Sequence, residues 1–162
     1  MLDQVHTFFK EQNVNHFICY GTLWGAIRYS KLMPFDRDVD LCVVYDDELE
    51  KSSLQQHELM RLVKEKFPEY YVMYDALENI YNIYLHKAMG EVVFFRRKDS
   101  ETIVRALSRL GDIDLTDSFP ARLIKNMGEM TVGNLRLPAP DTEIMQYWYP
   151  DSYTREVKPP NC

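Results

Sequence analysis

GTLWGAIR at residues 21–28 and DRDVDLCVV at residues 36–44 are the stretches that decide the fold of this chain. The second stretch reads as a buried strand with aspartates two residues apart. Asp38 and Asp40 would point from one face of that strand, because side chains alternate along it. Ionised carboxylates beside a core strand cost several kcal/mol unless a cation or hydrogen bonds compensate them. The sequence therefore predicts that Asp38 and Asp40 are catalytic residues that hold a divalent metal ion.

The metal expected here is Mg²⁺ or Mn²⁺, since these hard ions prefer carboxylate oxygens and can neutralise a pyrophosphate. Asp36 has the same parity as Asp38 and Asp40 but lies nearer the loop. It would either contact the metal or a water, or stabilise the turn. An EF-hand calcium loop is excluded because Leu41 stands where that loop needs glycine and Asp47 where it needs glutamate.

A phosphate cradle is expected at Gly21 and Thr22. A tight glycine turn that opens a helix offers unpaired backbone N–H groups to an anion. Arg28, on the helix that follows, would either reach a phosphate or stay at the surface in an ion pair. The aspartates, the Gly21-Thr22 turn and Arg28 together predict a nucleotide-phosphate site beside the metal.

The rest of the chain mixes helical and strand-like patterns without a repeat or a linker, so we expect one domain over residues 1–162. Helices are expected at Leu2–Glu11, between Gly21 and Pro34, and at Asp46–Lys66, Ser100–Leu110 and Asp141–Tyr149. Strands are expected at His16–Tyr20, Asp38–Tyr45, Tyr70–Tyr74, Ile80–His86 and Glu91–Phe95, with a hairpin around Gly133-Asn134.

Composition limits the possible partners. A net charge of −6 over 162 residues argues against a broad nucleic-acid footprint, which needs a basic face. No apolar run approaches the ~20 residues that span a bilayer, and no signal segment is visible, so we expect no membrane span and a cytoplasmic location.

Cys19, Cys42 and Cys162 form no CxxC pair, and the first two lie in apolar segments, where reduced, core-filling thiols are expected. The four histidines lack the spacing of a zinc site.

The two opening stretches resemble the LicD and fukutin family, whose members carry a GTLLGAxR helix and a PWDxDxD strand. Here the second motif reads PFDRDVD at residues 34–40, so Phe35 replaces the usual tryptophan. Weaker similarities follow in the family's order over nearly the whole chain: the strand around Glu91, Phe119-Pro120, the Gly133 strand with Pro138-Ala139-Pro140, and the aromatic segment Tyr147-Trp148-Tyr149-Pro150.

The resemblance implies an α+β, nucleotidyltransferase-like fold, a mixed sheet with flanking helices. It implies transfer of a phosphorylated alcohol, of the phosphocholine or ribitol phosphate type, from a CDP-linked donor to a glycan hydroxyl with release of CMP. The third acidic metal ligand, which the family often supplies as an aspartate in an apolar strand, would here be Glu91. Asp112 or Asp114, which share the alternating spacing, are its rivals. Bacterial relatives work in the cytosol and animal relatives in the secretory lumen.

Two other functions stay open: a catalytically silent relative that binds nucleotide or glycan, and a nucleotidyltransferase that releases pyrophosphate. Two further segments also have two interpretations. Arg96-Arg97-Lys98 is either a solvated strand edge or a contact for a phosphate-bearing acceptor, and Tyr147-Trp148-Tyr149 is either core or the lining of an acceptor groove.

Overall fold

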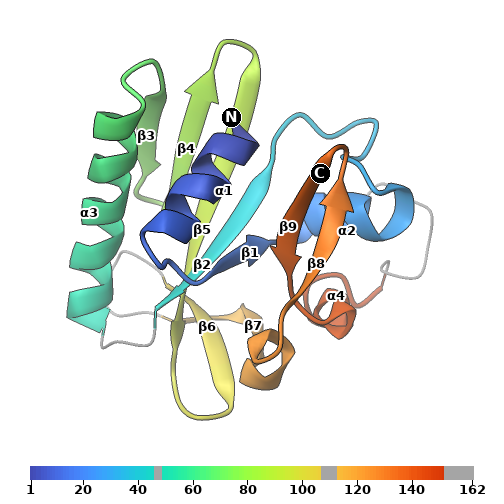
Figure 1. The fold of residues 1–162 in the computed structure, drawn as a ribbon. Coiled ribbons are helices and arrows are strands. Elements are labelled where there is room, and N and C mark those ends of the chain that lie inside the picture. Colours follow the sequence, from blue (N-terminus) through green and yellow to red (C-terminus); the bar gives the residue numbers. More distant parts are fainter. Residues whose placement is uncertain (46–48, 107–112, 152–162) are drawn as a thin grey trace.

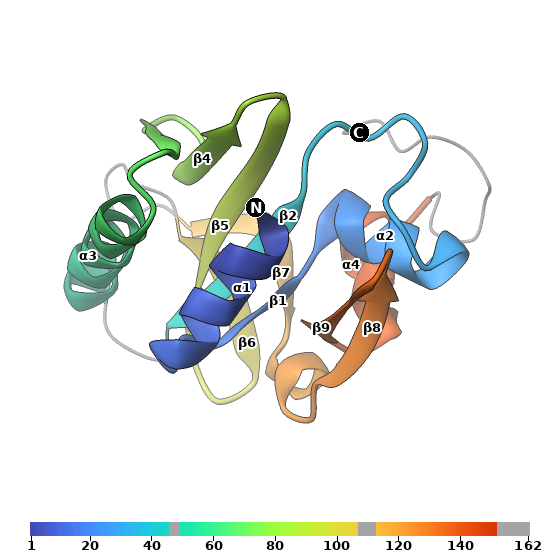
Figure 2. The same cartoon turned by 45° about the horizontal axis from the view of Figure 1, so that its top comes forward.

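A curled mixed sheet with helices around it forms the centre of the molecule (Figures 1 and 2). The computed structural model describes residues 1–45, 49–106 and 113–151, without the side chains of 49–54 and 113–116. The helices are α1 (Leu2–Glu11), α2 (Tyr20–Tyr29), α3 (Leu49–Lys66) and α4 (Met145–Trp148), with 3₁₀ helices η1 (Ala121–Ile124) and η2 (Thr142–Ile144). The strands are β1 (His16–Ile18), β2 (Asp40–Tyr45), β3 (Tyr71–Asp75), β4 (Ile80–Leu85), β5 (Ala88–Arg97), β6 (Thr102–Ala106), β7 (Ile113–Pro120), β8 (Gly128–Val132) and β9 (Leu135–Ala139).

The long strand β5 organises the sheet. It runs parallel to β2 on one side, and on the other side it pairs first with β4 and then with β6, both antiparallel. The sheet order is β1-β2-β5-β4-β3, and β6 and β7 extend it from the far end of β5. β8 and β9 form a separate hairpin around Gly133, whose φ is 63°. The expected α+β class and the expected hairpin are confirmed.

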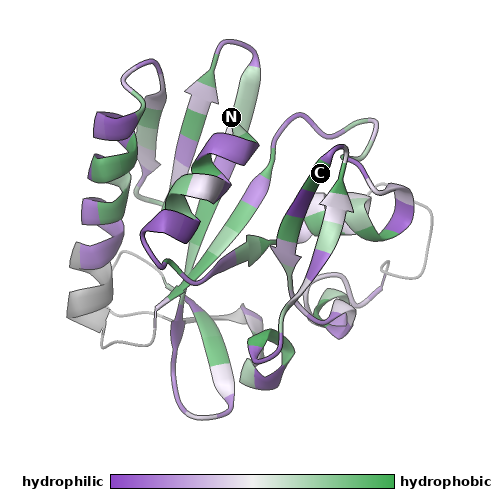
Figure 3. Cartoon of the chain, in the orientation of Figure 1, coloured by the Kyte–Doolittle hydropathy of each residue, from purple (hydrophilic) through white to green (hydrophobic). Residues whose placement is uncertain are grey.

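The helices pack on the sheet through apolar residues at helical spacing. α1 buries Val5, Phe8 and Phe9, which recur at helical spacing, and α3 buries Leu59 and Val63. Figure 3 shows hydrophobic colour along the central strands and hydrophilic segments on α1 and α3. In the part of the chain that the structure describes, no helix is both long and apolar enough to cross a membrane.

The expected helix over Ser100–Leu110 is wrong for its described part. Residues 102–106 form strand β6, and residues 107–110 lie outside the described ranges. The Asp99 carboxylate accepts the backbone N–H groups of Glu101 and Thr102 and turns the chain back toward β5. The β-branched residues Thr102, Ile103 and Val104 then favour a strand, which the open edge of β5 receives.

The turn before α2 differs from the expected glycine turn. β1 ends at Ile18, Cys19 is extended, and α2 already begins at Tyr20. The positive φ falls on Tyr20, at 42°, and Gly21 lies inside the first helical turn. The glycine that α2 needs for steric reasons is Gly25. A Cβ there would lie 2.4 Å from the carbonyl oxygen of Lys31 and 2.9 Å from the backbone nitrogen of Met33. The missing side chain lets the chain fold back toward the aspartates.

A disulfide joins Cys19 and Cys42, which corrects the expectation of two reduced thiols. β1 and β2 are antiparallel neighbours with Phe17 opposite Cys42, so Cys19 and Cys42 are diagonal neighbours with a Cα–Cα distance of 5.8 Å. Both cysteines are fully buried. Their separation of 23 residues gives no sequence signal of pairing, because the contact exists only once the strands pair.

We expect the double variant Cys19→Ala/Cys42→Ala to lose roughly 3 kcal/mol of unfolding free energy, since the disulfide closes a loop in the unfolded chain. Equilibrium urea unfolding measures this loss. Dithiothreitol should lower the wild-type midpoint toward that of the variant and leave the variant unchanged. A wild-type midpoint that does not respond to reductant would contradict the role of the disulfide.

Candidate metal centre

Three carboxylates from two neighbouring strands meet at one end of the sheet. Asp40 begins β2 and pairs in register with Glu91 of β5, and Asp38 lies two residues before Asp40. The backbone N–H of Glu91 donates to the carbonyl of Val39 at 2.8 Å, which extends the parallel ladder to this point. One ligand oxygen from each of Asp38, Asp40 and Glu91 lies within 4.8 Å of the others. The structure thus brings the three predicted ligands together.

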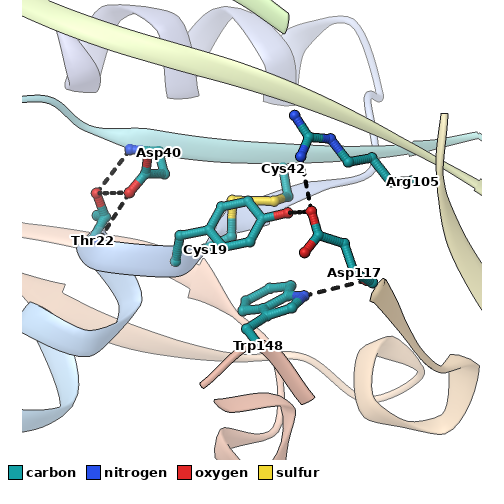
Figure 4. The surroundings of a disulfide bond; sticks show 8 residues. Cys19, Thr22, Asp40, Cys42, Arg105, Asp117 and Trp148 are labelled. Carbon is teal, nitrogen blue, oxygen red and sulfur yellow. Dashed lines mark hydrogen bonds and ion pairs between the residues drawn. A yellow bond between two sulfur atoms is a disulfide. The ribbon is translucent and has the colours of Figure 1, made fainter. Parts of the chain in front are cut away.

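Thr22 holds the buried carboxylate of Asp40 in place (Figure 4). The backbone N–H and the hydroxyl of Thr22 donate to Asp40 Oδ2 at 3.1 and 3.3 Å, and the backbone N–H of Asp40 donates to Thr22 Oγ1 at 2.8 Å. The first turn of α2 therefore donates hydrogen bonds directly to the Asp40 carboxylate. None of the described hydrogen bonds uses Asp40 Oδ1, which is the oxygen left for a cation.

The pKa values of Asp40 and Glu91 are raised above their ordinary values. Burial is the main reason that the pKa of Asp40 rises to about 8, and the nearby Asp38 and Glu91 add to the rise while the hydrogen bond from Thr22 opposes it. Burial and Asp38 also raise the pKa of Glu91, whereas Arg105 lowers it. A bound dication would reverse this balance by favouring the ionised carboxylates.

A pocket of about 220 Å³ opens over the three carboxylates. Gly21 and Asp36 also line it, in agreement with their expected nearness to the site. Thr22 is fully buried beneath Asp40 and is not among the lining residues. Arg28 lies elsewhere: its guanidinium carbon is 4.8 Å from the centroid of the Trp24 ring, and it lines a different pocket beside Thr142.

The far wall of the pocket holds a cation that the sequence reasoning missed. Arg105 of β6 donates from Nη1 to Asp117 Oδ2 at 2.9 Å (Figure 4). Tyr20 donates its hydroxyl to the same oxygen at 3.0 Å. Trp148 Nε1 donates to the backbone oxygen of Asp117 at 3.4 Å. Burial alone would lower the pKa of Arg105, but Tyr20 and Asp117 raise it above its ordinary value, so the guanidinium stays charged.

Arg105 is the single Lys or Arg among the described residues that line this pocket. No sequence motif marks Arg105 or Asp117, because β6 was expected to be a helix and the two residues meet only through the β6–β7 pairing. Of the rival third ligands, Asp112 lies outside the described residues. Asp114 lies on β7, opposite Arg105 in the β6–β7 register, and its side chain is also outside the described part.

The carboxylate set fits a hard divalent cation. Asp38, Asp40 and Glu91 offer oxygen atoms at mutual distances that one ion can bridge. Burial makes their charges costly without such an ion, as the raised pKa values of Asp40 and Glu91 express. Asp36 lines the same pocket but is not a member of this group of three carboxylates.

Comparison with known proteins gives a family and two relatives. The family model described as LicD/FKTN/FKRP, nucleotidyltransferase domain, matches residues 13–142. Over 49 residues, or 30% of this chain, the sequence is 33% identical to an uncharacterized protein of Rickettsia prowazekii (strain Madrid E) and to one of Rickettsia typhi (strain ATCC VR-144 / Wilmington). The match spans 18% and 16% of the length of these relatives.

We expect the metal-free protein to lose stability as the pH rises from about 4 to about 8. The unfolded chain ionises Asp40 near its ordinary pKa of 3.8, whereas the folded chain keeps it protonated up to about pH 8. Between these two values the unfolded state therefore binds fewer protons than the folded state. The free energy of unfolding falls by no more than about 1.4 kcal/mol per pH unit. Urea unfolding in EDTA measures the slope.

The variant Asp40→Asn should show a shallower slope over the same pH range, while Glu69→Gln, which alters an exposed carboxylate, should keep the wild-type slope. Parallel slopes for wild type and Asp40→Asn would show that Asp40 ionises normally in the folded protein.

Proposed function

Because the chain belongs to the LicD/FKTN/FKRP family of nucleotidyltransferase domains, we propose that it is a metal-dependent transferase. The proposed reaction moves a phosphorylated alcohol, of the phosphocholine or ribitol phosphate type, from a CDP-linked donor to a glycan hydroxyl and releases CMP. The observation that carries this proposal is the gathering of Asp38, Asp40 and Glu91 within 4.8 Å beside the first turn of α2. Such a cluster suits a metal ion that binds a diphosphate.

The bond changes are those of a phosphoryl transfer. The acceptor hydroxyl oxygen forms a bond to the phosphorus that bears the alcohol, the bond from that phosphorus to the oxygen of CMP breaks, and the hydroxyl proton passes to water. When bound, Mg²⁺ or Mn²⁺ would neutralise charge on the diphosphate. Asp38, Asp40 and Glu91 would hold that ion, with Asp36 at its edge.

The protein's own groups would orient the donor between two walls of the pocket. Gly21 lines the pocket at the start of α2, where the helix end favours a phosphate oxygen. Arg105 faces the site from β6 and would contact a phosphate as a fixed cation. This contact takes the role that the sequence suggested for Arg28. Asp117 and the Tyr20 hydroxyl would keep the guanidinium oriented.

The compartment is part of the proposal, and it differs from the cytoplasmic location expected from the sequence. The buried disulfide between Cys19 and Cys42 instead favours an oxidising compartment, since reducing compartments keep most thiols free. Mass spectrometry of the alkylated protein, purified from its native source, distinguishes the two by the redox state of Cys19 and Cys42.

We expect Asp38→Asn and Asp40→Asn each to lower turnover with CDP-choline or CDP-ribitol at least about 100-fold, as when a charge-stabilising element of a site is removed. Glu91→Gln should weaken Mn²⁺ binding, measured by calorimetry, as well as turnover. Chromatography of the nucleotide products follows the reaction, and Glu69→Gln serves as the exposed control.

The products separate the alternatives. Pyrophosphate in place of CMP would identify a nucleotidyltransferase. Nucleotide binding without turnover would identify a silent relative. Near-normal turnover of Asp38→Asn or Asp40→Asn would overturn the metal site, and metal affinity lost in Asp114→Asn but kept in Glu91→Gln would reassign the third ligand.

Arg105→Gln should weaken binding of CDP-choline with Mg²⁺ about tenfold or more, because it removes a charge-assisted hydrogen bond to phosphate. Arg28→Gln should leave the affinity within about twofold, which amounts to less than about 0.5 kcal/mol. Calorimetry measures both. Arg105→Lys should recover part of the affinity if charge matters, and circular dichroism checks that Arg105→Gln stays folded. Equal losses for Arg105→Gln and Arg28→Gln would contradict this assignment.

A further inference from the structure

A second and larger hollow lies beside the acidic pocket and has the opposite electrostatic character. This groove has a volume of about 880 Å³ and lies where the far ends of β5 and β7 meet η1 and α4. Arg97, Arg122 and Lys125 line it, against one carboxylate, Glu101. A cationic groove is unexpected on a chain of net charge −6 and indicates an anionic ligand.

The cations differ in how they are held. Arg122 donates from Nη1 to Glu143 Oε2 at 2.8 Å, an exposed ion pair that fixes the direction of the guanidinium. Lys125 is exposed, and its ammonium makes no ion pair within the described ranges. Arg97 ends β5 at the side of the groove, where the strand fixes its backbone opposite Ile103. The groove thus combines a fixed cation with an adaptable one.

The groove also offers apolar surface suited to a sugar ring. Tyr147 is 38% exposed and lines the groove together with Phe119 and Pro120. The C–H faces of a sugar ring pack on an aromatic face, while its hydroxyls stay available to Ser100, Thr102 and water. A ligand with both a saccharide ring and an anionic group matches the lining better than a nucleotide base or an apolar chain does.

The groove and the acidic pocket share their supporting elements. On β5, Glu91 and Val93 line the pocket, and Arg97, on the same face, lines the groove. On β7, Asp117 lines the pocket and the next residue, Ser118, lines the groove. On α4, Trp148 lines the pocket and Tyr147 lines the groove.

The wall between the two hollows is aromatic. The ring centroids of Phe95 and Phe119 lie 5.3 Å apart, and those of Phe119 and Trp148 lie 5.6 Å apart. A chain of sugars in the groove would have to cross this aromatic contact to present one end to the carboxylates.

We propose that this groove binds the acceptor as an anionic saccharide, with its phosphate or carboxylate between Arg97, Arg122 and Lys125 and a sugar ring on Tyr147. The acceptor role rests on the proposed function, whereas binding of the saccharide does not. The two can therefore fail separately.

The test is an NMR titration of the full ¹⁵N-labelled chain with glucose 6-phosphate, glucuronic acid, glucose and inorganic phosphate. Glucose 6-phosphate should move the amide signals of Thr102, Ala121 and Tyr147 and leave those of Gly21 and Asp40 in place. Glucose should bind at least about fivefold more weakly, which is about 1 kcal/mol. Comparable binding of glucuronic acid would mean that any anionic sugar suffices, and weaker binding would assign a phosphate.

The variant Arg97→Gln/Lys125→Gln should lose affinity for glucose 6-phosphate at least about fivefold, and Lys87→Gln, at an exposed turn outside the groove, should not change it. Shifts centred on Gly21 and Asp40, equal binding of glucose, inorganic phosphate that binds as tightly as glucose 6-phosphate, or an unaffected double variant would each overturn the proposal. Groove binding without any transfer of a phosphorylated alcohol would remove the proposed function and leave the saccharide site.

Discussion

The hydrogen bonds between Thr22 and Asp40 are the contact on which the arrangement of the site depends. They join the first turn of α2 to the start of β2, and they satisfy one oxygen of a buried carboxylate that burial would otherwise disfavour. β2 in turn sets the register of β5, which places Glu91 opposite Asp40. Asp40 therefore joins the first turn of α2, the β2–β5 pairing and the acidic cluster at one residue.

The sequence predicts most of what is local in this protein. The spacing of Val5, Phe8 and Phe9 predicts α1, and Gly133-Asn134 predicts the β8–β9 hairpin. The aspartates two residues apart locate the acidic end of β2 correctly, although only the structure shows that Asp38 precedes the strand. These features depend on the periodicity of a helix or a strand or on the chemistry of a turn, which a single segment carries by itself.

The features that escaped prediction are those that require two distant segments to meet. Cys19 and Cys42 bond because β1 lies beside β2, and Arg105 reaches Asp117 because β6 lies beside β7. Arg28, for which the sequence leaves a phosphate contact and a surface position open, lies over the Trp24 ring, a contact that the sequence does not indicate. The segment of β6 was expected to be helical, although Thr102, Ile103 and Val104 favour a strand, and the edge of β5 that receives it belongs to a separate segment.

The length of β5 between Glu91 and Arg97 limits the length of the acceptor that the protein can use. Glu91 and Arg97 are six residues apart on one continuous strand, which separates their Cα atoms by roughly 20 Å. A strand paired on both sides neither stretches nor shortens, so the distance between Glu91 and Arg97 is fixed. An acceptor anchored near Arg97 would place only the hydroxyl at the matching distance beside the carboxylates. Chain length, and not only chemical identity, would then select the substrate.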